Sequence, residues 1–174
     1  MEKIYTLCPL DNNDNEFFYE LYNDVLVQNN AISFDALPQT RSIVQERINR
    51  WMNSKIDKFF CIKNLENEPM GIAQIFNVEY SNRKCVVGLL LQGKYTQKGI
   101  GPLVLEELVR IAFYSMNLRK IEAKIHESNI PSIKMVERLK FTREGVLRES
   151  YYNNGQYEDI LLYGLLKDEF KSNH

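Results

Sequence analysis

A glycine-containing loop between an apolar run and an amphipathic segment constrains the fold of this chain more than any other feature. The loop reads Thr96-Gln97-Lys98-Gly99-Ile100-Gly101, after the apolar run at 86–91 and before a helical pattern that starts at Pro102. Glycines let the backbone approach a ligand closely, and the free N–H groups of a first helical turn point toward it. The helix dipole adds to their attraction for an anion. The pattern therefore predicts a strand, a phosphate-binding loop and a helix, in that order.

Two common phosphate-binding motifs do not fit this loop. A dinucleotide fingerprint needs a third glycine and an acidic ribose partner about 20 residues further on, and a P-loop needs Gly-Lys-Ser/Thr after a four-residue gap. Neither pattern is present after Gly99 and Gly101. The spacing Thr96-x-x-Gly99-x-Gly101 instead resembles the acyl-CoA loop of the GNAT superfamily of N-acetyltransferases, Gln/Arg-x-x-Gly-x-Gly/Ala, with Thr in the first position. A simple turn that begins a helix is the alternative interpretation.

The composition bounds the class of protein. A chain of 174 residues with 44% hydrophobic and 26% charged residues predicts one globular domain over 1–174. No apolar run approaches the ~20 residues that span a bilayer, and the N-terminus has no signal-peptide pattern. A net charge of −1 argues against a general nucleic-acid binder. The cysteines at 8, 61 and 85 have no metal-ligand spacing, so we expect reduced thiols, no metal and a cytoplasmic location.

The order of predicted elements is βααβββαβαββ, which indicates an α/β fold with a mixed sheet. A first helix is predicted from Phe17 to Val25 and a second after Pro38. The sequence Asn153-Asn154-Gly155 is a strong signal for a hairpin between the last two strands. The predicted strands lie at 4–8, 59–62, 70–78, 86–91, 120–125, 146–152 and 157–166.

This order is similar to that of the GNAT superfamily, and a second segment strengthens the resemblance. The segment 129–141 reads NIPSIKMVERLKF and resembles the family's N-x-x-A-I-x-x-Y-x-K-x-G-F. The tail from Glu144 to Asp159 is similar to the branch that contains spermidine N-acetyltransferase and the Rim-type protein N-terminal acetyltransferases. The resemblance covers most of residues 57–170 and is weakest over the first 55.

The resemblance implies an acetyl-CoA site. The backbone of Leu89, Leu90 and Leu91 would bind the pantetheine arm. The pyrophosphate would be held by the loop residues Gln97, Lys98, Gly99, Ile100 and Gly101. Asn129 matches a position that contacts the CoA chain from the opposite side, and it is also a natural helix N-cap.

The usual proton-transfer residues of the family are missing. Valine occupies both aligned positions: Val136 replaces the tyrosine general acid and Val86 the glutamate base. With a turn at Ser81-Asn82, Asn77 would pair with Val86 and Glu79 with Lys84, so both would share the face of Val86. We therefore hypothesise that Glu79 acts as the base through water and that Asn77 positions the acceptor. A solvated glutamate at a hairpin tip is the alternative.

Three other polar residues have weaker claims to a catalytic role. Tyr151 and Tyr152 are rival polar groups for proton transfer, although an aromatic pair in a strand more often belongs to the core. His126 ends a strand, and no partner in the sequence points to nucleophilic or metal chemistry.

The resulting expectation is an acetyl-CoA-dependent N-acetyltransferase that acts on a small or peptidyl primary amine. Residues 1–40 hold seven acids and one base, which favours a polyamine or a basic N-terminus as the acceptor. The two valines motivate an alternative, a catalytically weakened acyl-CoA-binding sensor or scaffold. A plain interaction domain is a third possibility. The resemblance also implies a homodimer.

Overall fold

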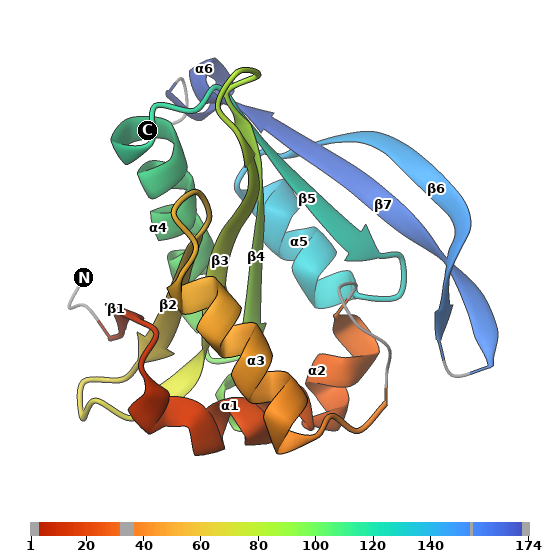
Figure 1. Ribbon diagram of the computed structural model, residues 1–174. Helices are drawn as coiled ribbons and strands as arrows, with labels where there is room; N and C mark the ends of the chain where they lie inside the picture. Colours follow the sequence, from red (N-terminus) through yellow and green to blue (C-terminus); the bar gives the residue numbers. More distant parts are fainter. Residues whose placement is uncertain (1–3, 32–36, 154, 172–174) are drawn as a thin grey trace.

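A seven-stranded mixed sheet with helices on both faces forms the protein (Figure 1). The computed structural model describes residues 4–31, 37–153 and 155–171. The strands are β1 (Thr6–Pro9), β2 (Lys58–Lys63), β3 (Pro69–Glu79), β4 (Lys84–Leu91), β5 (Lys120–His126), β6 (Thr142–Asn153) and β7 (Gln156–Leu166). Their order across the sheet is β1-β2-β3-β4-β5-β7-β6. All neighbours are antiparallel except β4 and β5, so the predicted α/β fold class is confirmed.

Six α-helices lie in the described ranges. They are α1 (Asn15–Tyr22), α2 (Val25–Asn30), α3 (Arg41–Met52), α4 (Ile100–Arg110), α5 (Ile130–Arg138) and α6 (Lys167–Lys171). Short 3-10 turns precede α1, at Asn12–Asp14, and α4, at Gly93–Tyr95, and a π-helical turn at Ile111–Ser115 extends α4. No helix in the described ranges is long and apolar enough to cross a membrane.

The first half of the chain corrects one prediction. A single helix was expected from Phe17 to Val25, but α1 ends at Tyr22 and a separate helix, α2, begins at Val25. The break occurs at Asp24, whose carboxylate accepts hydrogen bonds from the first amides of α2 and so favours a new helix start. The described residues before β2 therefore form three α-helices, where two were expected.

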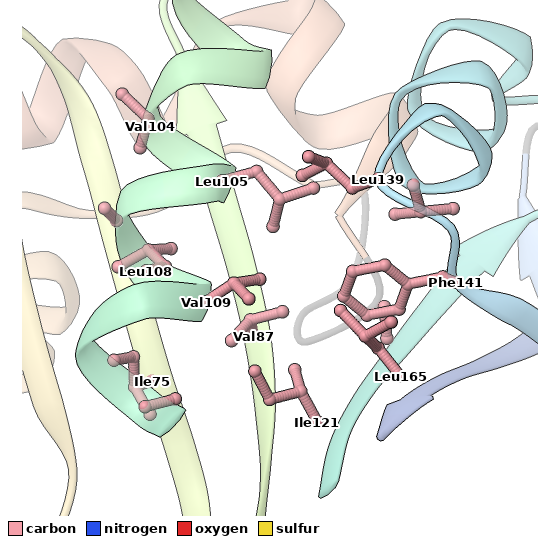
Figure 2. Close-up of a cluster of buried hydrophobic side chains, with 14 of the residues drawn as sticks. Ile75, Val87, Val104, Leu105, Leu108, Val109, Ile121, Leu139, Phe141 and Leu165 are labelled. Carbon is pink, nitrogen blue, oxygen red and sulfur yellow. The ribbon is translucent and has the colours of Figure 1, made fainter. Parts of the chain in front are cut away.

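Each face of the sheet has its own hydrophobic cluster. The larger one joins α4 and α5 to the centre of the sheet, and Figure 2 shows Leu105 and Val109 of α4 facing Val87, Ile121 and Phe141. The smaller one packs α1, α2 and α3 against β2 and β3 on the other face, with Phe18, Leu21 and Ile48 fully buried. Cys85, Val87, Leu89 and Leu91 of β4 belong to the larger cluster and Leu90 to the smaller one, because successive strand residues point to opposite faces. The strand thus has one side toward α4 and one toward α1–α3.

Candidate functional site

The parallel strands β4 and β5 separate halfway along their length (Figure 1). They pair only through 84–86 of β4 and 120–122 of β5. Beyond this point, within the described residues, β4 pairs with β3 alone and β5 with β7 alone. The edge of β4 from Val87 to Leu91 therefore presents backbone N–H and C=O groups that have no strand partner. Such an edge can bind an extended amide-containing chain by strand-like hydrogen bonds.

The glycine loop lies at the end of this edge, between β4 and α4. Gln97 and Gly99 both have positive φ, 59° and 77°, and Gly99 is the N-cap of α4. This alternation turns successive amides toward one side of the loop, an arrangement that binds anions. The amides of Gln97, Lys98 and Gly99 make no hydrogen bond with any described residue. Those of Ile100 and Gly101 belong to the first turn of α4, where no intrahelical acceptor exists.

Two lysines add positive charge beside the loop. Both Lys94 and Lys98 approach the ring of Tyr95, with Nζ 5.0 Å and 5.6 Å from its centroid. Cation–π contact holds an ammonium without neutralising it. The loop therefore combines free amides, a helix N-terminus and two cations, which suits a pyrophosphate. Thr96, which replaces the Gln or Arg of the motif, donates its hydroxyl to the carbonyl of Gly93 at 2.8 Å.

The lack of a side chain at Gly101 lets α4 lie close to α5 and β4. A Cβ built at this residue would lie 3.3 Å from Sδ of Met135 on α5 and 3.9–4.0 Å from the side chains of Leu91 and Leu89. Three of the residues expected to meet the ligand are thus gathered at the open edge of β4. This arrangement fits a slender chain that passes along β4 to a phosphate group at the loop.

Asn129 has the role of a helix cap. Its Oδ1 accepts a hydrogen bond from the amide of Ser132 at 3.2 Å, and α5 begins at the next residue. Its Nδ2 has no partner among the described residues and remains available as a donor. The predicted contact with CoA stays a prediction.

The two valines that replace the usual acid and base are core residues. Val86 is 7% exposed and Val136 is 2% exposed, and Val136 packs in the α4–α5 cluster. Neither side chain can donate or accept a proton. A proton route must therefore use other groups or water.

The predicted pairing of Asn77 with Val86 is wrong by one register position. Phe76, and not Asn77, lies opposite Val86, while Glu79 pairs with Lys84 as expected. A bulge between these pairs shifts the register, and Asn77 adopts a positive φ of 51° there. Asparagine tolerates this conformation better than most residues, which explains why the bulge forms at this position.

Glu79 lies at the β3–β4 hairpin, far from the open edge of β4. Its carboxylate accepts a hydrogen bond from Asn82 at 2.6 Å and forms an ion pair with Lys84 at 3.2 Å. These two partners lower the pKa of Glu79 below its ordinary value. Leu89 is five positions along β4 from Lys84, or roughly 17 Å along a strand. These features do not favour Glu79 as a base, and its role stays a prediction.

Several acids of the first 40 residues have partners within the protein. Asp14 forms a largely buried ion pair with Lys63 at 2.9 Å, and the hydrogen bond raises the pKa of that lysine. Glu16 pairs with Arg41, while Asp11 and Asp24 cap helical turns. Glu2 and Asp35 lie outside the described residues. The acidity of this half therefore reflects intramolecular contacts to a large extent, which weakens it as evidence for a cationic acceptor.

A polar cluster that no sequence pattern predicted lies at the end of β5. His126 is fully buried there, with Nδ1 3.2 Å from Oε2 of Glu158 on β7. Ser128 donates its hydroxyl to the same carboxylate oxygen at 2.8 Å, and the ring of Tyr151 on β6 packs edge-on against His126. The Asn-Gly hairpin signal predicted that β6 and β7 pair, and it could have placed Tyr151 near Glu158. The pairing of β7 with β5 had no local signal.

Comparison with known proteins agrees with this geometry. Residues 5–142 match the model of the acetyltransferase (GNAT) domain family. The chain is 27% identical to the uncharacterized N-acetyltransferase p20 of Bacillus licheniformis, over 98% of this chain and 99% of that protein. It is 21% identical to spermidine N(1)-acetyltransferase of Vibrio cholerae, over 98% and 97%.

A solved structure has the same fold. The spermidine N-acetyltransferase of Vibrio cholerae, determined in complex with CoA and spermine, superposes with a TM-score of 0.88 at 19% identity, over 96% of this chain and 98% of that one. The family match covers well over half of the sequence, and the open β4 edge and the glycine loop lie within it. The chain therefore belongs to the GNAT family of acetyltransferases.

Proposed function

We propose that the protein transfers an acetyl group from acetyl-CoA to a primary amine by direct attack in a ternary complex. One observation carries this proposal: the free edge of β4 leads directly to a loop of free amides at the N-terminus of α4. A pantetheine arm along Val87–Leu91 with its pyrophosphate at Gln97–Gly101 would place the thioester in the gap between β4 and β5.

The reaction needs few groups from the protein. A primary ammonium has a pKa near 10.4 and must lose a proton before its nitrogen attacks the thioester carbon. The C–N bond then forms and the C–S bond breaks, and the nitrogen loses a second proton. Of the two protons, one passes to solvent and one ends on the CoA thiolate. A thiol of pKa about 8.5 is a good leaving group and can depart without a general acid.

The backbone supplies the remaining stabilisation. Negative charge develops on the carbonyl oxygen during attack, and an amide of β4 between Val87 and Leu91, which has no partner on β5, would donate to it. One preorganised donor at such an oxygen is worth about 2.7–4 kcal/mol in other acyl-transfer enzymes. This contribution does not depend on the side chains at 86 and 136.

A polyamine or a basic peptide N-terminus is the acceptor we favour. The similarity to a spermidine acetyltransferase supports a polyamine. The acids of the first 40 residues support it only weakly, because several are engaged within the protein. Formation of a homodimer, expected from the family resemblance, remains part of the proposal.

The test is release of CoA from acetyl-CoA with a panel of polyamines, N-terminal peptides, amino sugars and aminoglycosides, followed by mass spectrometry of the products. Mass detection avoids interference from the three cysteine thiols. Turnover of one class would establish the acceptor. Stabilisation by acetyl-CoA without turnover of any amine would favour the second candidate, an acyl-CoA-binding protein with weakened catalysis, which the buried Val86 and Val136 motivate.

A further inference from the structure

The cluster around Glu158 lies on the sheet face opposite α4. On β5, Ile121, Ala123 and Ile125 face the α4–α5 cluster, so the alternate residue His126 lies on the other face. His126 pairs with Ile160 of β7, and Tyr151 of β6 pairs with Glu158. Paired and alternate residues share a face, which brings all three polar side chains together.

This position is at the wide end of the gap between β4 and β5. The strands stop pairing at Val86 and Glu122, and His126 is the last residue of β5, four positions further along. The glycine loop reaches the gap from the α4 side. A thioester that enters from that side would have its other face toward Glu158. The hydroxyl of Tyr151 donates to the carbonyl of Ala31, which connects the cluster to the end of α2.

The Glu158 carboxylate is held in place through one of its two oxygens. Oε2 accepts the hydroxyl hydrogen of Ser128 and lies 3.2 Å from Nδ1 of His126. Oε1 has no partner among the described residues, and the side chain is 19% exposed. One oxygen is thus fixed by the protein while the other can accept a hydrogen bond from a ligand.

His126 is a second sign that this site is built for a ligand. It is fully buried, and neither ring nitrogen has a hydrogen bond of good geometry with the described residues. A buried imidazole that lacks a well-formed hydrogen bond is costly, and such a cost is common at functional sites. The acids beside Glu158 are engaged differently: Glu127 accepts the amide of Asp159, and Asp159 accepts that of Glu149.

We propose that Glu158 binds a protonated amino group of the acceptor, with Ser128 and His126 as positioning residues. This inference rests on the proposed function and names a specificity residue for it. A nearby carboxylate raises the pKa of an ammonium, so it would hinder deprotonation of the attacking nitrogen. The bound ammonium is therefore the one that is not acetylated, and the acceptor is a small molecule with at least two amino groups.

The test compares 1,4-diaminobutane with n-butylamine, which differ by one ammonium group. For Glu158→Gln we expect KM for the diamine to rise about 10- to 100-fold, as expected for loss of a charge-assisted hydrogen bond. The KM values for n-butylamine and acetyl-CoA should not change. An unchanged KM for the diamine, or an equal loss with both amines, would overturn the proposal.

Three further variants make the result specific. Glu144→Gln removes a carboxylate of β6 at the opposite end of the β6–β7 pair, where Glu144 pairs with Lys120 at 2.7 Å. This variant should leave KM for both amines and for acetyl-CoA unchanged. Glu158→Asp keeps the charge and should restore part of the affinity. If Glu158→Gln does not fold, Ser128→Ala should still raise KM for the diamine several-fold without changing that for n-butylamine, and no change would overturn the proposal.

Titration calorimetry separates this inference from the proposed function. We expect the CoA-loaded protein to bind 1,4-diaminobutane more tightly than its Glu158→Gln variant does, whether or not acetyl transfer occurs. Binding that depends on Glu158 without any turnover would refute the proposed function and leave the site intact. If the diamine is acetylated but binds equally well to the wild type and to the Glu158→Gln variant, the role of Glu158 is refuted and the proposed function stands.

Discussion

Oδ2 of Asp24 accepts a hydrogen bond from the amide of Gly93 at 2.9 Å, across 69 residues of sequence. The other oxygen of the same carboxylate accepts from the first amides of α2, with Leu26 at 2.8 Å. Gly93 begins the 3-10 turn that leads into the glycine loop. One side chain therefore connects the helices on one face of the sheet with the candidate phosphate site. Gly93 also needs to be small, since a Cβ there would lie 3.1 Å from Leu26 and 3.3 Å from Asp24.

Replacing Asp24 by alanine should affect both stability and ligand binding. Loss of an N-cap costs about 1 kcal/mol, and loss of a hydrogen bond to a carboxylate costs a further 1.5–3 kcal/mol or so. We expect the free energy of unfolding to fall by roughly 2–4 kcal/mol and the Kd for acetyl-CoA to rise several-fold, as measured by urea denaturation and calorimetry. Asp11→Ala removes only the cap of the turn at Asn12–Asp14 and should not change the Kd. Equal Kd values for both variants would contradict the connection.

Substitution of Gly99 tests the loop itself. Its φ of 77° costs a residue with a Cβ about 1–2 kcal/mol, although no atom crowds the position. Gly99→Ala should therefore weaken acetyl-CoA binding at least tenfold, because the amides lose their common direction. Gly155→Ala is a matched control: Gly155 has φ 85°, is equally uncrowded and lies in the β6–β7 turn. The control should lose similar stability and keep its affinity for acetyl-CoA, and a parallel loss of affinity would refute a role for the loop.

Local signals explain which parts of the fold could be predicted from the sequence. The Asn-Gly hairpin, the glycine loop and the cap at Asn129 each depend on a few neighbouring residues with special backbone preferences. The break between α1 and α2 was also a local event, but the apolar pattern of Phe17, Leu21 and Val25 hid the cap at Asp24. Hydrophobic periodicity alone does not reveal a helix cap within an otherwise continuous apolar stripe.

The candidate site depends more on contacts between residues that are far apart in the sequence, and these contacts were harder to predict. The bulge at Asn77 changed the register by one position and removed the expected pairing with Val86. Glu158 and His126 meet only because β7 inserts between β5 and β6 in the sheet. Asp14 meets Lys63 across 49 residues. No local pattern encodes these contacts, since each depends on strand order and register.

The role of Glu79 can be decided by kinetics. Its partners Asn82 and Lys84 lower its pKa, and a weaker base contributes less to proton abstraction. We expect Glu79→Gln to leave kcat within about twofold between pH 6 and 9, because water can accept the proton of the amine instead. A large fall in kcat together with loss of a basic limb in the pH profile would support the hypothesis drawn from the sequence. Asn82→Ala, which removes one partner of the same carboxylate, is the control for local disruption.

The buried thiols of Cys61 and Cys85 should make the protein less stable in alkali. Burial raises the pKa of each thiol to about 12, whereas an unfolded cysteine has a pKa near 8.5. Above about pH 8.5 the unfolded state therefore releases protons that the folded state retains, so the free energy of unfolding falls as pH rises toward 12. Each thiol contributes up to about 1.4 kcal/mol per pH unit. Urea denaturation at pH 8 and pH 10 measures the fall, which should be smaller in Cys85→Ala than in the wild type. An equal fall in both proteins would contradict the pKa shift at Cys85.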